Sequence, residues 1–323
     1  MQRQTVLIVS DIHYASPAEQ LRRDHEVNVI SNPLLRLFIR FFRHYIWLRA
    51  PMEKNHLLDQ FIERAGQPDW VVANGDYSCD SAFLGVSDDA AFQSAQQCLG
   101  KLRQAFQPQF RAVFGDHELG KKSLLGDRGG MRLASLHRSE TELGLEPFWR
   151  LELGHYVLIG VVSSLIALPV FESDSLPGEL AEWAQARERH LAKIREAFAR
   201  LRPEQRVILF CHDPSALPFL WEESAIREKI SRLEQTIIGH LHSPAILWKS
   251  RLLAGIPPIR FLGTTVQRAT TALSRARHWQ EFHVRLCPAL AGIELLKDGG
   301  FLSMELDLSA QTPARFTRHR IAR

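Results

Sequence analysis

The chain has 323 residues, with 40 Lys and Arg against 36 Asp and Glu, which gives a formal net charge of +4. Hydrophobic residues make up 45% of the sequence and charged residues 24%, which are ordinary globular proportions and exclude a disordered, collagen-like or coiled-coil chain. The length allows one large domain or two small ones.

Cysteine spacing and hydropathy predict the cellular environment. Cys79, Cys98, Cys211 and Cys287 show no CxxC spacing, so we expect free thiols in a reducing compartment. The N-terminus lacks the long apolar region of a signal peptide. The longest uncharged apolar run, residues 156–171, is short for a membrane span and is interrupted by serines and a proline. We therefore expect a cytoplasmic protein without a transmembrane helix.

Strand-like apolar segments alternate with helical patterns through the first three quarters of the chain, which predicts an α/β fold. The predicted strands are 5–9, 70–73, 110–114, 156–162, 206–211 and 236–238, and the predicted helices are 55–65, 88–106 and 178–201. From about residue 243 the pattern indicates a strand-rich C-terminal part, mainly antiparallel, with strands at 259–262, 283–286, 293–296 and 301–306.

Acidic and histidine side chains follow five of these predicted strands, at the point where each strand ends. They are Asp11 and His13, Asp76, Asp116 with His117 and Glu118, His212, and His240 with His242. The carboxyl ends of strands in an open α/β sheet meet at one edge, where ligands bind. Carboxylates and imidazoles crowded there would repel or stay unsatisfied without a cation, so the pattern predicts a metal site.

The order of these motifs resembles that of the calcineurin-like metallophosphoesterases. They read DIH at 11–13, GD at 75–76, GDHE at 115–118, CHD at 211–213 and GHLH at 239–242. The resemblance spans residues 5–242 and implies two packed mixed β-sheets flanked by helices, a four-layer α/β/β/α sandwich. It also implies a single domain over residues 1–323, with the C-terminal strands in the second sheet.

The resemblance further implies a centre of two divalent metal ions. Asp11, His13 and His242 would hold one ion, Asp116, His212 and His240 would hold the other, and Asp76 would bridge them. His117 would stand beside the scissile phosphate as a general acid or a transition-state donor, and Glu118 would orient it. Oxygen and nitrogen ligands without thiolate suit Mn, Fe, Zn or Co.

Two close divalent ions lower the pKa of a shared water, and the resulting bridging hydroxide would attack phosphorus in line. We therefore expect a metal-dependent phosphoesterase acting on a phosphate mono- or diester. A catalytically inactive metal-binding scaffold is the alternative. Loss of His117 or Asp76 would favour the scaffold, and both residues are present.

Asp116 departs from the family pattern, which usually has Asn at this position. A carboxamide oxygen ligates without charge, whereas an ionised Asp116 lowers the net charge of the centre by one. We expect either a preference for a monoanionic diester or a changed metal preference; the alternative is a neutral replacement by another competent oxygen ligand. Lys121 and Lys122 follow this motif, and we expect them in a solvated loop rather than on the substrate phosphate.

A basic, apolar helical insert is predicted at about 30–50, with the sequence LLRLFIRFFRHYIWL at residues 34–48. Arg36, Arg40 and Arg43 fall on one helical stripe, and most of the apolar residues lie opposite. Docking on the protein core or on a second subunit is one interpretation. The other is a membrane-surface hydrolase of a lipid-like phosphoester or pyrophosphate, held on an anionic membrane through Leu34–Leu48. The sequence shows no aromatic–basic groove of the kind that binds nucleic acid, so we do not expect a nucleic-acid partner. The sequence does not set the oligomeric state.

Overall fold

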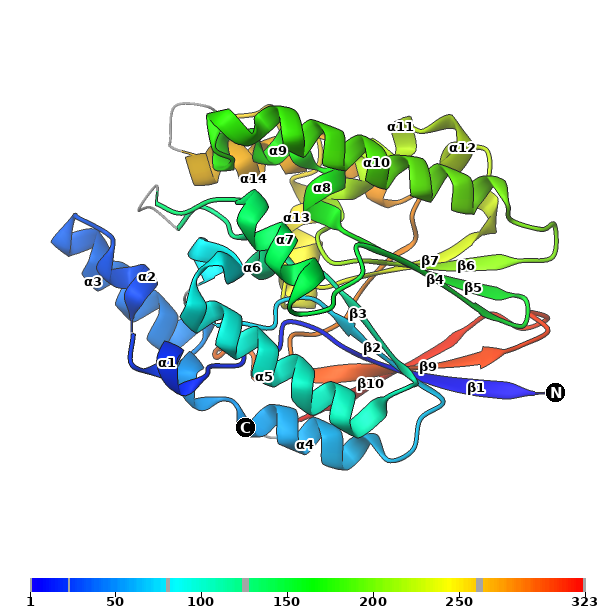
Figure 1. Ribbon diagram of the computed structural model, residues 1–323, viewed down its shortest axis with the longest axis horizontal. Helices are drawn as coiled ribbons and strands as arrows, with labels where there is room; N and C mark the ends of the chain where they lie inside the picture. Colours follow the sequence, from blue (N-terminus) through cyan, green and yellow to red (C-terminus); the bar gives the residue numbers. More distant parts are fainter. Residues whose placement is uncertain (1, 23, 80–81, 124–127, 260–263, 322–323) are drawn as a thin grey trace.

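The computed structural model describes residues 2–22, 24–79, 82–123, 128–259 and 264–321. Two five-stranded mixed sheets pack face to face, and helices cover both outer faces (Figure 1). The four-layer α/β/β/α sandwich expected from the sequence is therefore confirmed. All four cysteines are free and buried. None of the helices within the described ranges has the length and apolar character needed to cross a membrane.

The first sheet has the order β10-β9-β1-β2-β3 and the second the order β4-β5-β6-β7-β8. The strands of the first sheet are β1 (Arg3–Val9), β2 (Trp70–Asn74), β3 (Phe110–Val113), β9 (Gly300–Asp307) and β10 (Arg315–Arg320). Those of the second are β4 (Phe148–Leu153), β5 (Tyr156–Val161), β6 (Arg206–Cys211), β7 (Leu233–Ile238) and β8 (Val284–Leu286). Strands β1, β2 and β3 run parallel, as do β5, β6, β7 and β8, so their carboxyl ends meet at one edge of the sandwich.

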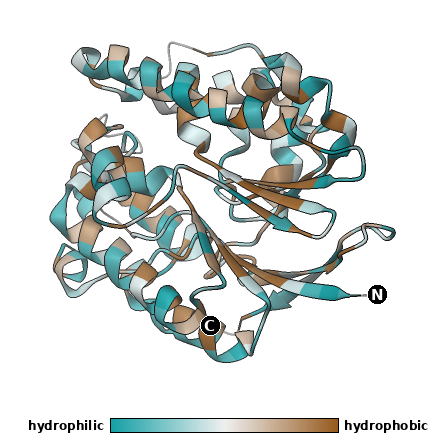
Figure 2. Ribbon diagram, turned by 45° about the vertical axis from the view of Figure 1, so that its right-hand side comes forward, coloured by the Kyte–Doolittle hydropathy of each residue, from teal (hydrophilic) through white to brown (hydrophobic). Residues whose placement is uncertain are grey.

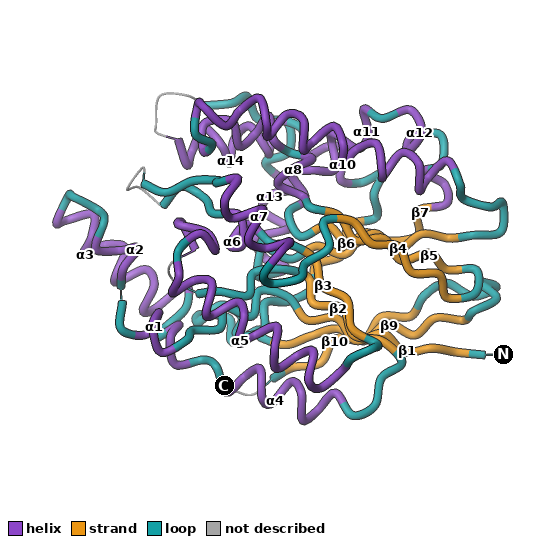
Figure 3. The backbone as a smooth tube through the Cα atoms, in the orientation of Figure 1, coloured by secondary structure: helices purple, strands orange, loops and turns teal. Residues whose placement is uncertain are grey.

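Helices flank the two outer faces of the sandwich, and Figure 3 separates helices from strands by colour. The helices of the first half are α1 (Pro17–Gln20), α2 (His25–Asn28), α3 (Pro33–Phe42), α4 (His56–Ala65), α5 (Asp89–Phe106), α6 (Asp116–Leu119) and α7 (Leu133–Thr141). Those of the second half are α8 (Ser163–Ile166), α9 (Leu168–Phe171), α10 (Leu180–Ala199), α11 (Leu217–Glu222), α12 (Ser224–Arg227), α13 (Pro244–Leu252) and α14 (Thr264–Ser274). Helices α4 and α5 lie below the first sheet, and α10 lies above the second (Figure 1).

The alternation of side chains along β1 explains the layering. Val6 and Ile8 belong to the apolar cluster between the two sheets, whereas Leu7 and Val9 belong to the cluster under the helices. All four side chains are buried. A strand buried on both faces reads as a continuous apolar run, and much of the central strands in Figure 2 is accordingly coloured as hydrophobic.

The C-terminal part differs from the sequence-based expectation. Helices α13 and α14 come first, so the chain is not strand-rich from residue 243. Strands β9 and β10 join the first sheet beside β1, not the second, and only β8 extends the second sheet. The expected strand at 293–296 is a turn, because the Ile293 N–H bonds to Asp298 Oδ1 and the Lys297 N–H bonds back to the Ile293 carbonyl. Most of the strand expected at 259–262 lies outside the described residues.

Candidate metal centre

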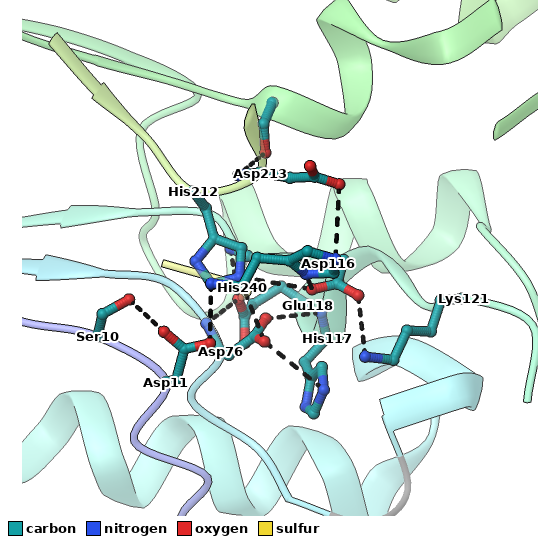
Figure 4. Close-up of polar contacts among 12 residues, drawn as sticks. Ser10, Asp11, Asp76, Asp116, His117, Glu118, Lys121, His212, Asp213 and His240 are labelled. Carbon is teal, nitrogen blue, oxygen red and sulfur yellow. Dashed lines mark hydrogen bonds and ion pairs between the residues drawn. The ribbon is translucent and has the colours of Figure 1, made fainter. Parts of the chain in front are cut away.

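The loops that follow β1, β2, β3, β6 and β7 bring seven predicted ligands together at one edge of the sandwich. They form two groups, Asp11, His13, Asp76 and His242, and Asp76, Asp116, His212 and His240. Within each group, the potential ligand atoms all lie within 4.8 Å of one another. Asp76 belongs to both groups (Figure 4). These groups contain the same residues as the two ligand sets that the family resemblance implied.

Five of the seven side chains stand on left-handed backbone. They are Asp11 (φ 50°), His13 (φ 52°), Asp76 (φ 61°), His240 (φ 57°) and His242 (φ 57°). Such a conformation costs about 1–3 kcal/mol per residue, although Asp and His tolerate it better than most residue types. The bends are held by hydrogen bonds between motifs, since Asp11 N–H donates to the Gly75 carbonyl and His13 N–H to the Asp76 carbonyl. The motif spacing gave no sign of this strain.

The motif glycines permit the close approach of these loops. A Cβ atom on Gly115 would lie 2.1 Å from Asp76 Oδ1, and one on Gly239 would lie 2.1 Å from Ser10 Oγ. No side chain fits at either distance. The two glycines therefore allow the carboxylates to converge.

Backbone carbonyls fix the orientation of three imidazoles. His212 Nδ1 donates to the Asn74 carbonyl at 2.5 Å, and His117 Nδ1 donates to the Ser78 carbonyl at 2.8 Å. His13 Nδ1 makes a longer bond of 3.3 Å to the same Ser78 carbonyl. A carbonyl can only accept, so Nδ1 carries the hydrogen in each ring, and Nε2 is the nitrogen left for a further partner.

One ring nitrogen of His13 indicates whether the first ligand group suits a metal ion. His13 Nε2 is buried and has no hydrogen-bond partner among the described residues. Buried polar atoms rarely stay unpaired, and an imidazole lone pair beside two carboxylates is a strong ligand set for a divalent cation. The residues of this group therefore fit a bound ion.

The charges of the second group are set by its neighbours. Burial raises the pKa of Asp116, but Lys121 and His240 outweigh burial and hold that pKa well below its usual value. Burial and repulsion by Asp116 also oppose ionisation of Asp76, yet His117 and His212 keep its pKa below the usual range. Both carboxylates are thus anionic at neutral pH, as metal ligands must be.

Lys121 is paired with Asp116 and does not lie in a solvated loop. Its Nζ atom lies 2.9 Å from Asp116 Oδ2, and its side chain is 21% exposed (Figure 4). The other carboxylate oxygen, Oδ1, lies 3.1 Å from His240 Nδ1. The expectation of a solvated Lys121 is therefore wrong, because the short link from α6 turns its ammonium back onto the motif carboxylate.

His117 and Glu118 have different surroundings from those expected. His117 is buried with Nε2 3.6 Å from Asp76 Oδ2, and burial lowers the pKa of His117 to about 3. Glu118 does not orient His117; the Ser78 carbonyl does so. Glu118 instead accepts the N–H groups of Gly115, Asp76 and Tyr77 at 2.7, 3.1 and 2.8 Å, which ties the second motif to the third.

Residues 4–244 match the calcineurin-like phosphoesterase family. The chain belongs to this family. It is therefore a hydrolase of phosphoric ester bonds. No curated protein matches the sequence.

The chain shows a distant similarity to three solved structures. The phosphopantetheinyl hydrolase of Mycobacterium tuberculosis is 14% identical, with 74% of this chain and 83% of that chain covered and a TM-score of 0.37. The yellow lupin (Lupinus luteus) purple acid phosphatase is 11% identical, with 75% and 38% covered and a TM-score of 0.37. The Thermus thermophilus 5'-nucleotidase precursor is 13% identical, with 98% and 54% covered and a TM-score of 0.37.

A cavity of about 370 Å³ lies beside the first ligand group of the phosphoesterase. The side of the cavity near the metal ligands is lined by His13, His117 and His242. The apolar side is lined by Phe42, Trp47, Leu48 and Cys79. The remaining lining residues are four cations, Arg43, Lys121, Lys122 and Arg268. Trp47 packs on His242 with 4.9 Å between ring centroids. Arg268, from α14, is ion-paired with the buried Asp174. Sequence analysis missed Trp47 and Arg268 as cavity residues, because neither belongs to a motif.

Proposed function

We propose that this phosphoesterase hydrolyses a phosphate mono- or diester at a centre of two divalent metal ions. The observation that carries the proposal is the pair of ligand groups that share Asp76. One ion would be held by Asp11, His13 and His242, the other by Asp116, His212 and His240, and Asp76 would bridge them. Two ions supply a water of lowered pKa and positive charge for the phosphoryl oxygens. The donor set suits Mn, Fe, Zn or Co.

His117 is the proposed acid or transition-state donor. Its Nδ1–H is committed to the Ser78 carbonyl, so any proton for the leaving group must come from Nε2. The ring is neutral without substrate, because burial keeps its pKa at about 3. A phosphate in the cavity brings negative charge close to Nε2 and raises the pKa of His117, which favours a protonated ring only when substrate is present.

The charge of the centre bears on the choice between monoesters and diesters. Two divalent ions carry +4 and the three carboxylates carry −3, which would leave +1. The paired Lys121 restores +2, the value that an uncharged ligand at position 116 would give. The diester preference expected from Asp116 alone is thereby offset, and we propose that dianionic monoesters are also accepted.

We also propose that residues 1–323 form a single domain. Strands β9 and β10 from the C-terminal part extend the first sheet at β1, so the sheet that holds the first motif depends on both ends of the chain. Removal of the C-terminal strands would expose the β1 edge and the apolar layer between the sheets.

The test is hydrolysis of p-nitrophenyl phosphate and of bis-p-nitrophenyl phosphate by metal-stripped protein refilled with Mn, Fe, Co or Zn. We expect metal-dependent turnover and two ions per chain by elemental analysis. Asp76→Asn should lower both the turnover and the number of bound ions. Asp307→Asn changes another buried carboxylate, at the opposite end of the sheet, and should lower neither quantity. Two bound ions without turnover of either ester would support the inactive scaffold.

A further inference from the structure

Helix α3 presents an apolar face to solvent. The large side chains of this face are Leu34, Leu37, Phe38 and Phe41, which are 78%, 66%, 60% and 57% exposed, and Tyr45, in the turn after α3, is 57% exposed. At about 100° per residue the four α3 side chains fall on one stripe of the helix. Figure 1 shows α3 at the left margin of the molecule, beyond both sheets. A contiguous exposed apolar face of this kind marks an interaction surface.

The insert does not need this face for its own packing. Its buried side is a separate small cluster in which Ile39, with Leu35, packs on Val27 and Ile30. The first turn of α3 is capped by Asn32, whose side-chain oxygen accepts the N–H groups of residues 34 and 35. The helix is thus fixed from one side, and its opposite side remains available to a partner.

The charge of the insert identifies the class of partner. Residues 27–52 contain four arginines and no acidic residue. Arg36 donates to the Ile30 carbonyl and Arg40 to the Asn28 side-chain oxygen, and these neutral oxygens do not cancel the positive charge. Two copies of this surface would bring like charges together, whereas an anionic surface would be attracted. Arginines opposite an aromatic and leucine face are typical of a helix that lies in a bilayer interface.

The insert also leads from this outer face into the cavity beside the metal ligands. After Phe42 a π-helical turn, Arg43–Trp47, redirects the chain, so that Phe42, Trp47 and Leu48 line the cavity. The turn is anchored by the Glu294 N–H bond to the Trp47 carbonyl at 2.7 Å and the Leu295 N–H bond to the Ile46 carbonyl. One segment therefore supplies both the exposed apolar face and the apolar wall of the cavity.

We propose that α3 docks its apolar face on an anionic lipid bilayer and that the cavity receives phosphoesters with apolar chains held in that bilayer. The substrate part of this inference rests on the proposed function. Docking buries the face in the headgroup region, and the insert arginines add attraction to anionic lipid. The phosphate of such an ester meets the metal-ligand side of the cavity, while its apolar part meets Phe42 and Trp47.

Binding is tested by co-sedimentation of the metal-loaded full chain with phosphatidylcholine vesicles, with and without phosphatidylglycerol. We expect the wild type to bind the anionic vesicles, and Leu37→Gln/Phe38→Gln to bind about tenfold more weakly or less. The control is Leu252→Gln on α13, because Leu252 is 65% exposed and lies outside the insert. It should bind as the wild type does.

Two outcomes would overturn the docking inference. One is equal sedimentation of the wild type and Leu37→Gln/Phe38→Gln, including no sedimentation of either. The other is a wild-type dimer in light scattering that the double variant converts to a monomer, which would assign the face to a second copy of the chain.

Hydrolysis separates the docking inference from the proposed function. Hexadecyl p-nitrophenyl phosphate in anionic vesicles is the membrane-held ester, and bis-p-nitrophenyl phosphate is the soluble one. We expect Leu37→Gln/Phe38→Gln to lose about tenfold on the vesicle ester and to keep the soluble rate. Vesicle binding without hydrolysis of either ester would contradict the proposed function but not the docking inference. Hydrolysis of the soluble ester, with equal rates for the wild type and the double variant on the vesicle ester, would contradict only the substrate inference.

Discussion

Lys121 Nζ lies 2.9 Å from Asp116 Oδ2, while Oδ1 of the same carboxylate faces His240. An asparagine at this position would have to point its NH₂ group either toward the Lys121 ammonium or toward the metal-ligand side. Only a carboxylate offers an acceptor in both directions. The departure from the family motif at position 116 and the lysine five residues later are therefore physically matched.

The first prediction concerns this pair. Asp116→Asn should weaken binding of one metal ion strongly in the wild-type background, because a negative charge that attracts the ion is lost while the Lys121 ammonium stays beside the site. In a Lys121→Met background the same change should cost less, with a coupling of about 1–3 kcal/mol. Titration calorimetry of the metal-free proteins with Mn or Zn measures all four members of this double-mutant cycle. Equal losses in both backgrounds would show that the two residues act independently.

The second prediction concerns His117. His117→Asn should lower kcat by about 10²–10⁴-fold with unchanged metal content, because the group at Nε2 is lost. The loss should be larger for an alkyl phosphate than for a p-nitrophenyl ester, whose leaving group needs no proton. His190→Gln also removes a buried imidazole but should keep the activity. A loss of equal size for both leaving groups would favour a transition-state donor over a general acid.

The third prediction concerns Glu118, which accepts three backbone N–H groups from two motifs. Glu118→Gln replaces one acceptor oxygen by a donor, which leaves at least one buried N–H unpaired and should cost about 1–3 kcal/mol of unfolding free energy. Urea denaturation of the metal-free protein measures this. Glu142→Gln, at an exposed ion pair with Arg138, should change stability by less than about 0.5 kcal/mol. A comparable loss in both variants would contradict the structural role of Glu118.

The fourth prediction concerns pH and His190, which lies on α10 and does not line the cavity. Its Nε2 accepts the Val162 N–H at 3.0 Å, and burial, with Lys193, lowers the pKa of His190 to about 3. Between pH 6.5 and about 3 the unfolded chain binds a proton that the folded chain does not. Stability should therefore fall as the pH drops through this interval, by about 1.4 kcal/mol per pH unit from this group.

Chemical denaturation of metal-free wild type and of His190→Gln at several pH values tests the fourth prediction. The difference in stability between the two proteins should shrink below pH 6.5. A difference that stays constant with pH would mean that His190 is charged in the folded protein.

The sequence determined the strands that precede the site motifs, and the motifs themselves, because both depend on local patterns. The predicted strand 206–211 has the bounds of β6, since a buried parallel strand reads as an unbroken apolar run. The ligand residues follow strand ends directly, so their convergence at one edge followed from the α/β pattern.

Only the tertiary structure decided which distant segments meet. The same apolar pattern suits an edge strand of either sheet, and packing places β9 beside β1. The acceptor role of Glu118 depends on the backbone of Tyr77, and the position of Trp47 depends on a bond from Glu294, far along the chain. Periodicity assigns a face to a helix but not a partner, so the exposure of Phe38 and Phe41 became evident only once the packing of α3 was known.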